Sequence, residues 1–114
     1  ELGHPEPFNM KYLGIGNEEV GDPFFERYPY FHKAIREKHP EIKLINSAGP
    51  FPAGSEYDKG WESAKKWSSD YVDEHYYTSP EWMLANVHRY DGFDSQGPRG
   101  FLGEYGMLSV RLHI

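Results

Sequence analysis

The sequence has 114 residues, a net charge of −6 at pH 7 and no cysteine. A chain of this length can form one small domain, whose core buries a smaller share of its surface than that of a large protein. The negative charge argues against a nucleic-acid partner, because binding to phosphates needs dense positive charge. Without cysteine there is no disulfide, thiol nucleophile or thiolate metal site. No stretch reaches the ~18 apolar residues of a membrane span, so no membrane partner is expected.

Short apolar runs alternate with longer amphipathic stretches, a pattern typical of α/β proteins. The first run, residues 12–15, predicts a strand. Asp22-Pro23 then predicts a helix start, and Pro29 is expected to mark a second start, because proline fits a first helical turn but breaks an interior. The apolar spacing predicts that this helix ends near His39, before Pro40.

In the middle of the chain, the sequence predicts a second strand, then a loop, then at most a short helix. The segment IKLINSAG, residues 42–49, reads as a strand closed by Gly49-Pro50. Residues 51–60 are rich in glycine, proline and polar side chains and predict a loop. At most a short helix is expected over residues 61–68.

The third predicted strand is DYVDEHYY, residues 70–77. A helix should follow, because Ser79-Pro80-Glu81 combines an N-cap residue, a proline at the first position and a carboxylate in the first turn. Met83, Val87 and Tyr90 would give that helix an apolar face.

A polar loop leads to the fourth predicted strand, FLGEY, residues 101–105. The resulting order, three strand–helix units and a last strand, predicts parallel strands with covering helices. We place the domain boundary at residue 106, and treat residues 107–114 as a tail that could be a further strand or a frayed end.

Polar residues gather at the ends of three predicted strands, where parallel α/β architectures collect functional side chains. They are Asn17, Glu18 and Glu19 on the first, residues 73–77 on the third, and Glu104 and Tyr105 on the fourth. A carboxylate beside a buried run is costly unless it is paired, hydrogen-bonded or used. Two carboxylates facing each other across a cleft are the groups that glycoside hydrolysis needs.

Alternative interpretations exist for each of these side chains. Glu18 and Glu104 could be ordinary strand-end acids, and Glu19 reads better as a loop charge than as the acid. His75 could be a core histidine and Tyr77 a core aromatic residue.

Asp73 and Glu74 alternate faces of their strand, so only one can point toward the cleft. The glycine-rich GIGNEEVG segment lacks the Lys-Ser/Thr of a phosphate loop, and the six histidines show no close metal-binding pair with a carboxylate. No metal or cofactor is therefore expected.

Four segments resemble one enzyme family. PFNMKYLGIGNEEVG, AIREKHPEIKLI, VDEHYYTSPEWMLANVHRYD and FLGEYG together are similar to the catalytic domain of the glycoside hydrolase family 51 α-L-arabinofuranosidases. The resemblance reaches to about Gly106, which stands where the family usually has alanine. It implies a partial (β/α)8 TIM barrel, strands 4 to 7, because a whole barrel needs ~250 residues.

By this resemblance Glu18 matches the acid/base, Glu104 the nucleophile and Asn17 the amide that binds a sugar hydroxyl. His75 and Tyr77 lie on the piece similar to strand 6, from which side chains reach the sugar or orient the nucleophile. The expected reaction releases terminal α-L-arabinofuranosyl residues from arabinose-containing oligo- or polysaccharides by a retaining mechanism.

The rival interpretations are a non-catalytic carbohydrate-binding module and an inert fragment of a larger enzyme. An incomplete barrel also has unpaired sheet edges, which predicts self-association. A polysaccharide substrate would favour a secreted or periplasmic location over a cytoplasmic one.

Overall fold

The computed structural model describes residues 3–108, which form a parallel sheet with helices. The elements follow in the order β1 (Tyr12–Ile15), α1 (Asp22–Lys38), β2 (Lys43–Ser47), α2 (Ser55–Trp67), β3 (Tyr71–Thr78), α3 (Pro80–Ala85) and β4 (Arg99–Met107). The four strands are parallel and lie in the order β1-β2-β3-β4. Each strand thus pairs with the strand that precedes it in the chain, as in the successive strand–helix units of a barrel. The predicted α/β class, with parallel strands and covering helices, is confirmed.

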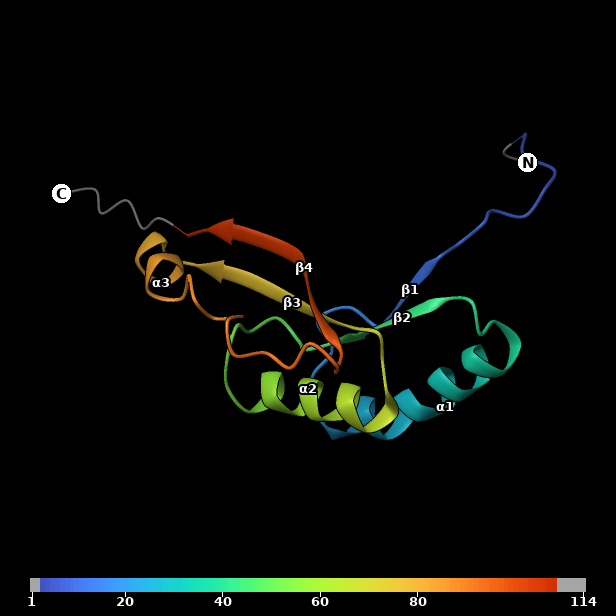
Figure 1. The fold of residues 1–114 in the computed structure, drawn as a ribbon, viewed down its shortest axis with the longest axis horizontal. Helices are drawn as coiled ribbons and strands as arrows, with labels where there is room; N and C mark the ends of the chain where they lie inside the picture. The colour runs from blue at the N-terminus through green and yellow to red at the C-terminus, as the bar shows by residue number, and fades with distance from the viewer. Residues whose placement is uncertain (1–2, 109–114) are drawn as a thin grey trace.

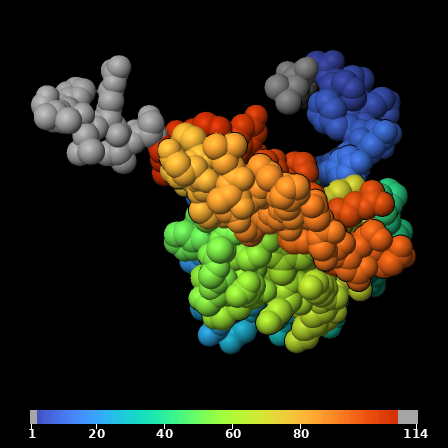
Figure 2. Space-filling model, turned by 60° about the vertical axis from the view of Figure 1, so that its left-hand side comes forward, coloured from blue at the N-terminus to red at the C-terminus, as the bar shows by residue number. Residues whose placement is uncertain are grey.

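Helices α1 and α2 lie along one side of the sheet, and α3 lies beside the end of β3 (Figure 1). Two small clusters form the core between the sheet and these helices. In the first cluster, Tyr28 of α1 packs with Ile15, Ile42 and Leu44. In the second, two residues of α2 pack with residues of the sheet side: Trp61 and Ala64 with Ala48 and Val72. The space-filling view in Figure 2 shows the segment after α3 lying across α2. Among the described residues no helix is long and apolar enough to cross a membrane.

Helix α1 corrects the expectation of a second start at Pro29. The helix is continuous from Asp22 to Lys38, with Pro29 in its interior. An interior proline costs ~3 kcal/mol because it removes one hydrogen bond and crowds the preceding turn. Tyr28 and His32, on either side of Pro29, are both buried, and Tyr28 packs with Ile15 and Leu44 of the sheet. This burial offsets the cost of the interior proline.

Helix α2 corrects the expected loop over residues 51–60. It begins at Ser55 and includes Gly60, which is buried. A Cβ added to Gly60 would lie 2.6 Å from the Cα of Ala48, so the glycine lets the helix pack directly on the end of β2. Gly60 weakens the local helical signal but serves this close approach.

Helix α3 is shorter than expected. Ser79 caps it as predicted, accepting a hydrogen bond from the Trp82 N–H at 3.1 Å, but it ends at Ala85. Val87 is exposed, so the predicted apolar face is not formed. Strand β4 is longer than expected at both ends and includes Met107. Residues 109–114 of the predicted tail lie outside the described residues, and the division at residue 106 stays a prediction.

Candidate active site

Strand β3 sends alternate side chains to opposite faces of the sheet, as a pleated strand must. Asp73 and His75 share one face, because His75 Nε2 lies 3.1 Å from Asp73 Oδ2. Glu74 points to the other face, where it accepts a hydrogen bond from the Trp61 indole N–H at 2.8 Å. Sequence reasoning left the choice between Asp73 and Glu74 open, although the spacing of two residues to His75 could have selected Asp73.

A β-bulge in β4 brings Glu104 to the same face as His75. Glu74 pairs with Leu102 and His75 pairs with Glu104, which leaves Gly103 as an extra residue on β4. In a parallel pair the partnered residues point to the same face, so an unbroken register would place Glu104 beside Tyr76 on the helix side. The extra residue reverses this direction, a use of bulges that is common beside active sites.

Gly103 also makes room for a neighbouring acid. A Cβ added to Gly103 would lie 2.1 Å from Asp73 Oδ1 and 3.0 Å from Asp73 Cγ. A side chain here would force the Asp73 carboxylate to move, because real Cβ atoms do not approach other heavy atoms so closely. Gly103 therefore determines both the direction of Glu104 and the place of Asp73.

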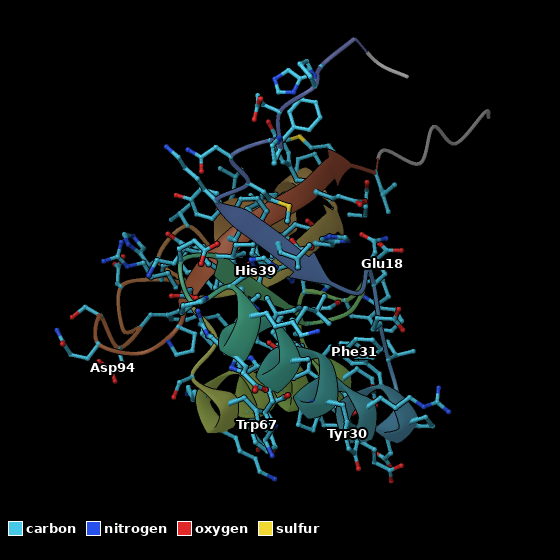
Figure 3. All side chains as sticks on the ribbon, turned by 90° about the vertical axis from the view of Figure 1, so that its right-hand side faces the viewer. Glu18, Tyr30, Phe31, His39, Trp67 and Asp94 are labelled. Carbon is cyan, nitrogen blue, oxygen red and sulfur yellow. The ribbon has the colours of Figure 1, made fainter. Side chains whose placement is uncertain are left out.

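Glu18 reaches the site from the loop that follows β1 (Figure 3). Its backbone φ is +52°, a left-handed conformation that residues other than glycine rarely adopt. The following amide, Glu19 N–H, donates to Ser47 Oγ at 3.2 Å and ties the loop to the end of β2. Such strained conformations persist where surrounding contacts hold them, often at functional sites.

One nitrogen of the His75 imidazole faces the carboxylates of both Glu18 and Glu104. This nitrogen, Nδ1, is 3.0 Å from Glu18 Oε1 and 3.7 Å from Glu104 Oε2. The residue is only 1% exposed, whereas Glu18 and Glu104 are partly open to solvent. A buried ring nitrogen thus faces two acids that a solute can reach.

Two further predicted site residues lie at the solvent side of this group. The Tyr77 hydroxyl donates to Glu104 Oε2 at 2.9 Å, and Tyr77 is 45% exposed. Asn17 is exposed and precedes Glu18 directly. The structure therefore brings Glu18, His75, Tyr77 and Glu104 into contact and leaves the amide of Asn17 facing solvent beside them.

The surroundings of these side chains shift their proton affinities. Burial lowers the pKa of His75, but the hydrogen bonds and charges of Glu18, Asp73 and Glu104 outweigh it, so the pKa is raised above its ordinary value. Burial raises the pKa of Asp73 even though the charge of His75 opposes that shift. The hydrogen bond to Glu104 raises the pKa of the Tyr77 hydroxyl. The raised pKa values of His75 and Asp73 favour keeping a proton in this group of side chains.

Glu18, His75 and Glu104 each offer one possible metal-ligand atom within 4.8 Å of the others. No other such group of three occurs among residues 3–108. Hydrogen bonds already link the imidazole to its neighbouring acids, so shared protons are sufficient to hold this arrangement.

Two acids at the ends of parallel strands, joined through a histidine, are the site expected of a glycoside hydrolase with a barrel fold. The sequence model of the α-L-arabinofuranosidase 1 domain matches residues 1–95. The chain therefore belongs to the α-L-arabinofuranosidase 1 domain family, and the resemblance stated from its motifs is confirmed.

Named relatives agree with this assignment. The chain is 45% identical over 106 residues to an extracellular exo-α-L-arabinofuranosidase of Streptomyces chartreusis, covering 92% of this chain and 13% of the relative. It is 32% identical over 108 residues to α-L-arabinofuranosidase 1 of Arabidopsis thaliana, covering 94% of this chain and 14% of the relative. The chain thus spans about one seventh of these relatives' length.

A solved structure shows the same fold. The chain superposes on an arabinose-bound MgGH51 α-L-arabinofuranosidase with a TM-score of 0.61 and 34% sequence identity. The match covers 91% of this chain and 15% of the other. The parallel sheet described here therefore corresponds to part of a family 51 TIM-barrel enzyme.

Proposed function

We propose that this chain supplies the acid/base and the nucleophile of a retaining α-L-arabinofuranosidase. The supporting observation is the approach of Glu18 and Glu104, whose carboxylate oxygens lie within 4.8 Å of each other. Retaining glycosidases hold their two carboxyl groups ~5 to 5.5 Å apart, whereas inverting enzymes hold them ~6.5 to 9.5 Å apart to admit a water. The approach of one oxygen from each acid to within 4.8 Å supports direct attack by one carboxylate.

The surroundings of the two acids suggest their roles. Glu104 accepts the Tyr77 O–H and faces the imidazole of His75, contacts that stabilise an ionised nucleophile. Glu18 would donate its proton to the glycosidic oxygen while Glu104 attacks the sugar carbon. It would then act as base toward the water that releases the sugar. The exposed amide of Asn17 would bind a sugar hydroxyl.

The substrate class follows from the relatives. Because those named above are α-L-arabinofuranosidases, terminal arabinofuranosyl residues of oligo- or polysaccharides are the proposed substrate. A polymeric substrate lies outside the cell, so secretion or export to the periplasm is proposed for this protein. One relative is named extracellular, which agrees with that proposal.

Variants of the two acids test these roles in the gene-encoded protein that contains this chain. Glu104→Ala should abolish turnover of every substrate. Glu18→Ala should spare aryl arabinofuranosides with acidic phenols, because such leaving groups need little protonation. Glu19→Gln is the matched control, since Glu19 is next to Glu18 in the chain and its backbone N–H, which the substitution keeps, donates to Ser47. Equal losses on both substrate types in the Glu18 variant would contradict the assignment.

We also propose that the chain by itself associates with a second copy and hydrolyses arabinofuranosides poorly. Within residues 3–108, β1 and β4 each pair with a strand on one side only. Several of their large apolar side chains are exposed: Tyr12, Phe101, Leu102 and Tyr105. Unpaired edges with exposed apolar residues recruit further strands. Sedimentation at micromolar concentration should show a mass above 13.3 kDa. A fully active monomer would refute this proposal.

A further inference from the structure

Asp73 has no part in the proposed reaction, yet it holds the imidazole that faces both proposed catalytic acids. We propose that Asp73 is a positioning residue, which keeps a proton on His75 Nε2 so that Nδ1 shares a second proton with Glu18. The inference rests on the proposed function and deepens it, because it names the residue that orients His75 toward the proposed acid, Glu18.

The hydrogen bonds fix where the imidazole carries its proton. Asp73 is taken as ionised in this proposal: burial raises its pKa, but the charge and hydrogen bond of His75 oppose that shift. An ionised carboxylate only accepts hydrogen bonds, so His75 Nε2, 3.1 Å from Asp73 Oδ2, is then the donor. In the opposite neutral tautomer, the lone pair of Nε2 would face the negative charge of Asp73. With Nε2–H held in this way, Nδ1 is the atom left to face Glu18 Oε1 at 3.0 Å.

One proton between Nδ1 and Glu18 can then occupy either partner. Protonated Glu18 donates to a neutral imidazole, or the imidazolium donates to ionised Glu18; the total charge is the same in both arrangements. The charged groups that face His75 are Asp73 on its own strand, Glu18 after β1 and Glu104 on β4. All three carry negative charge when ionised, so together they retain this proton near the cleft.

The proton can be followed through both reaction steps. In the first, the O–H bond of Glu18 breaks as an O–H bond forms on the leaving glycosidic oxygen, and Glu104 bonds to the sugar carbon. Ionised Glu18 then faces a neutral imidazole. In the second step Glu18 takes a proton from water, whose oxygen displaces Glu104 from the sugar. The shared proton is restored, and Asp73 stays ionised throughout.

The backbone prepares the place of Asp73. Its side chain is 18% exposed and occupies the space that Gly103 leaves free, with Oδ1 2.1 Å from where a Cβ would stand. The same glycine forms the bulge that directs Glu104 toward His75. One residue of β4 thus aligns the positioning acid and the proposed nucleophile with a single imidazole.

The test is Asp73→Asn in the gene-encoded protein that contains this chain, with ¹⁵N NMR of the imidazole nitrogens. The wild-type protein should show His75 protonated at Nε2. In the variant this preference should be lost, because an amide can donate as well as accept. For substrates that need protonation, kcat should fall about 10²-fold with little change in KM. The alkaline limb of the pH profile, where the acid loses its proton, should shift to lower pH, and substrates with acidic phenols should be spared.

Asp58→Asn is the matched control, since Asp58 is an exposed acid on α2, and it should leave the spectrum and the pH profile unchanged. A wild-type His75 protonated only at Nδ1 would overturn the proposal even if the Asp73 variant fails to fold. So would an Asp73→Asn protein with an unchanged pH profile. A protein without arabinofuranosidase activity but with Nε2 protonated would refute the proposed function alone, because the spectrum does not depend on turnover.

Discussion

Glu74 and His75 are neighbours in the chain, but they lie on opposite faces of β3 in different surroundings. On the helix side, Glu74 is fully buried and accepts hydrogen bonds from four neutral donors. They are the hydroxyls of Tyr57, Tyr76 and Tyr90 and the indole N–H of Trp61. On the open side, the partners of His75 are three carboxylates.

The difference lies in which partners can exchange a proton. Burial and the hydrogen bonds to Glu74 raise the pKa of Tyr57 and Tyr76, and raise that of Tyr90 to about 12. These hydroxyls keep their protons at neutral pH, so the Glu74 network is a structural one. On the open side, burial raises the pKa of Asp73, and the hydrogen bonds and charges of the neighbouring acids outweigh burial and raise the pKa of His75. A buried charged group therefore indicates chemistry only when its partners can also gain or lose a proton.

The largest expected effect is the loss of the Glu74 network. Glu74→Leu would remove the acceptor that the three tyrosine hydroxyls share with the Trp61 indole N–H, and between the hydroxyls only the Tyr76–Tyr90 contact at 2.6 Å would remain. Arg89, whose guanidinium packs over the Tyr57 and Tyr76 rings, would lose the nearby charge of Glu74. Breaking such a network costs about 3–5 kcal/mol. Urea denaturation followed by circular dichroism should show this loss. Glu62→Leu, at an exposed position on α2, should change little. Equal stability of the two variants would contradict the structural role of Glu74.

The next effect concerns the bulge on the open face. Gly103→Ala would force its Cβ onto Asp73 Oδ1, and relieving such overpacking costs about 1–3 kcal/mol. The shift should also move Glu104 away from His75, so arabinofuranosidase activity should fall more than stability. Gly92→Ala is the control, because a Cβ there meets nothing within 4 Å. Unchanged activity in the Gly103 variant would show that the bulge does not direct the nucleophile.

Asp70, just before β3, is a third charged group, and its partners differ from those of both Glu74 and His75. It accepts hydrogen bonds from Arg36 at 2.5 Å and from the Leu44 N–H at 2.9 Å. Burial alone would raise the pKa of Asp70, but these contacts and Lys43 lower it below 3.8. Its stabilising contribution is therefore present above that pH and is lost as the pH falls through the lowered folded value.

Asp70→Asn should cost about 1.5 kcal/mol at neutral pH and leave the shape of the activity profile unchanged. Denaturation curves at pH 7 and at pH 3 would measure the difference, which should shrink at the lower pH. A cost that does not depend on pH would argue against an ionised Asp70.

The smallest effect is the pH dependence that His75 confers on folding. Because its folded pKa is raised above 6.5, the stabilisation is fully present below that pH and is lost as the pH rises through the raised value. His75→Gln should flatten the stability curve in this interval. Thermal unfolding of both proteins between pH 6 and pH 9 would show it, and parallel curves would contradict a charged His75 in the folded state.

Local patterns were sufficient to predict the elements that contain strong local signals. Strands are predicted over residues 12–15 and 70–77 and observed at Tyr12–Ile15 and Tyr71–Thr78, because their apolar and β-branched or aromatic side chains suit a pleated surface. Ser79 caps a helix as its sequence predicts. The glycine, proline and polar side chains of residues 51–60 predict a loop, but α2 begins at Ser55. Local pattern misses this start because Gly60 packs on Ala48, a residue twelve positions earlier.

The sequence by itself determined the order of strands and helices, and it placed Glu18, His75, Tyr77 and Glu104 at strand ends, because periodicity and capping act over a few residues. Only the tertiary structure decided that Asp73 rather than Glu74 faces the site and that Gly103 turns Glu104 toward His75. These outcomes depend on the register between strands, which is set by contacts between residues far apart in the chain. A shift of one residue in that register reverses every side chain beyond it.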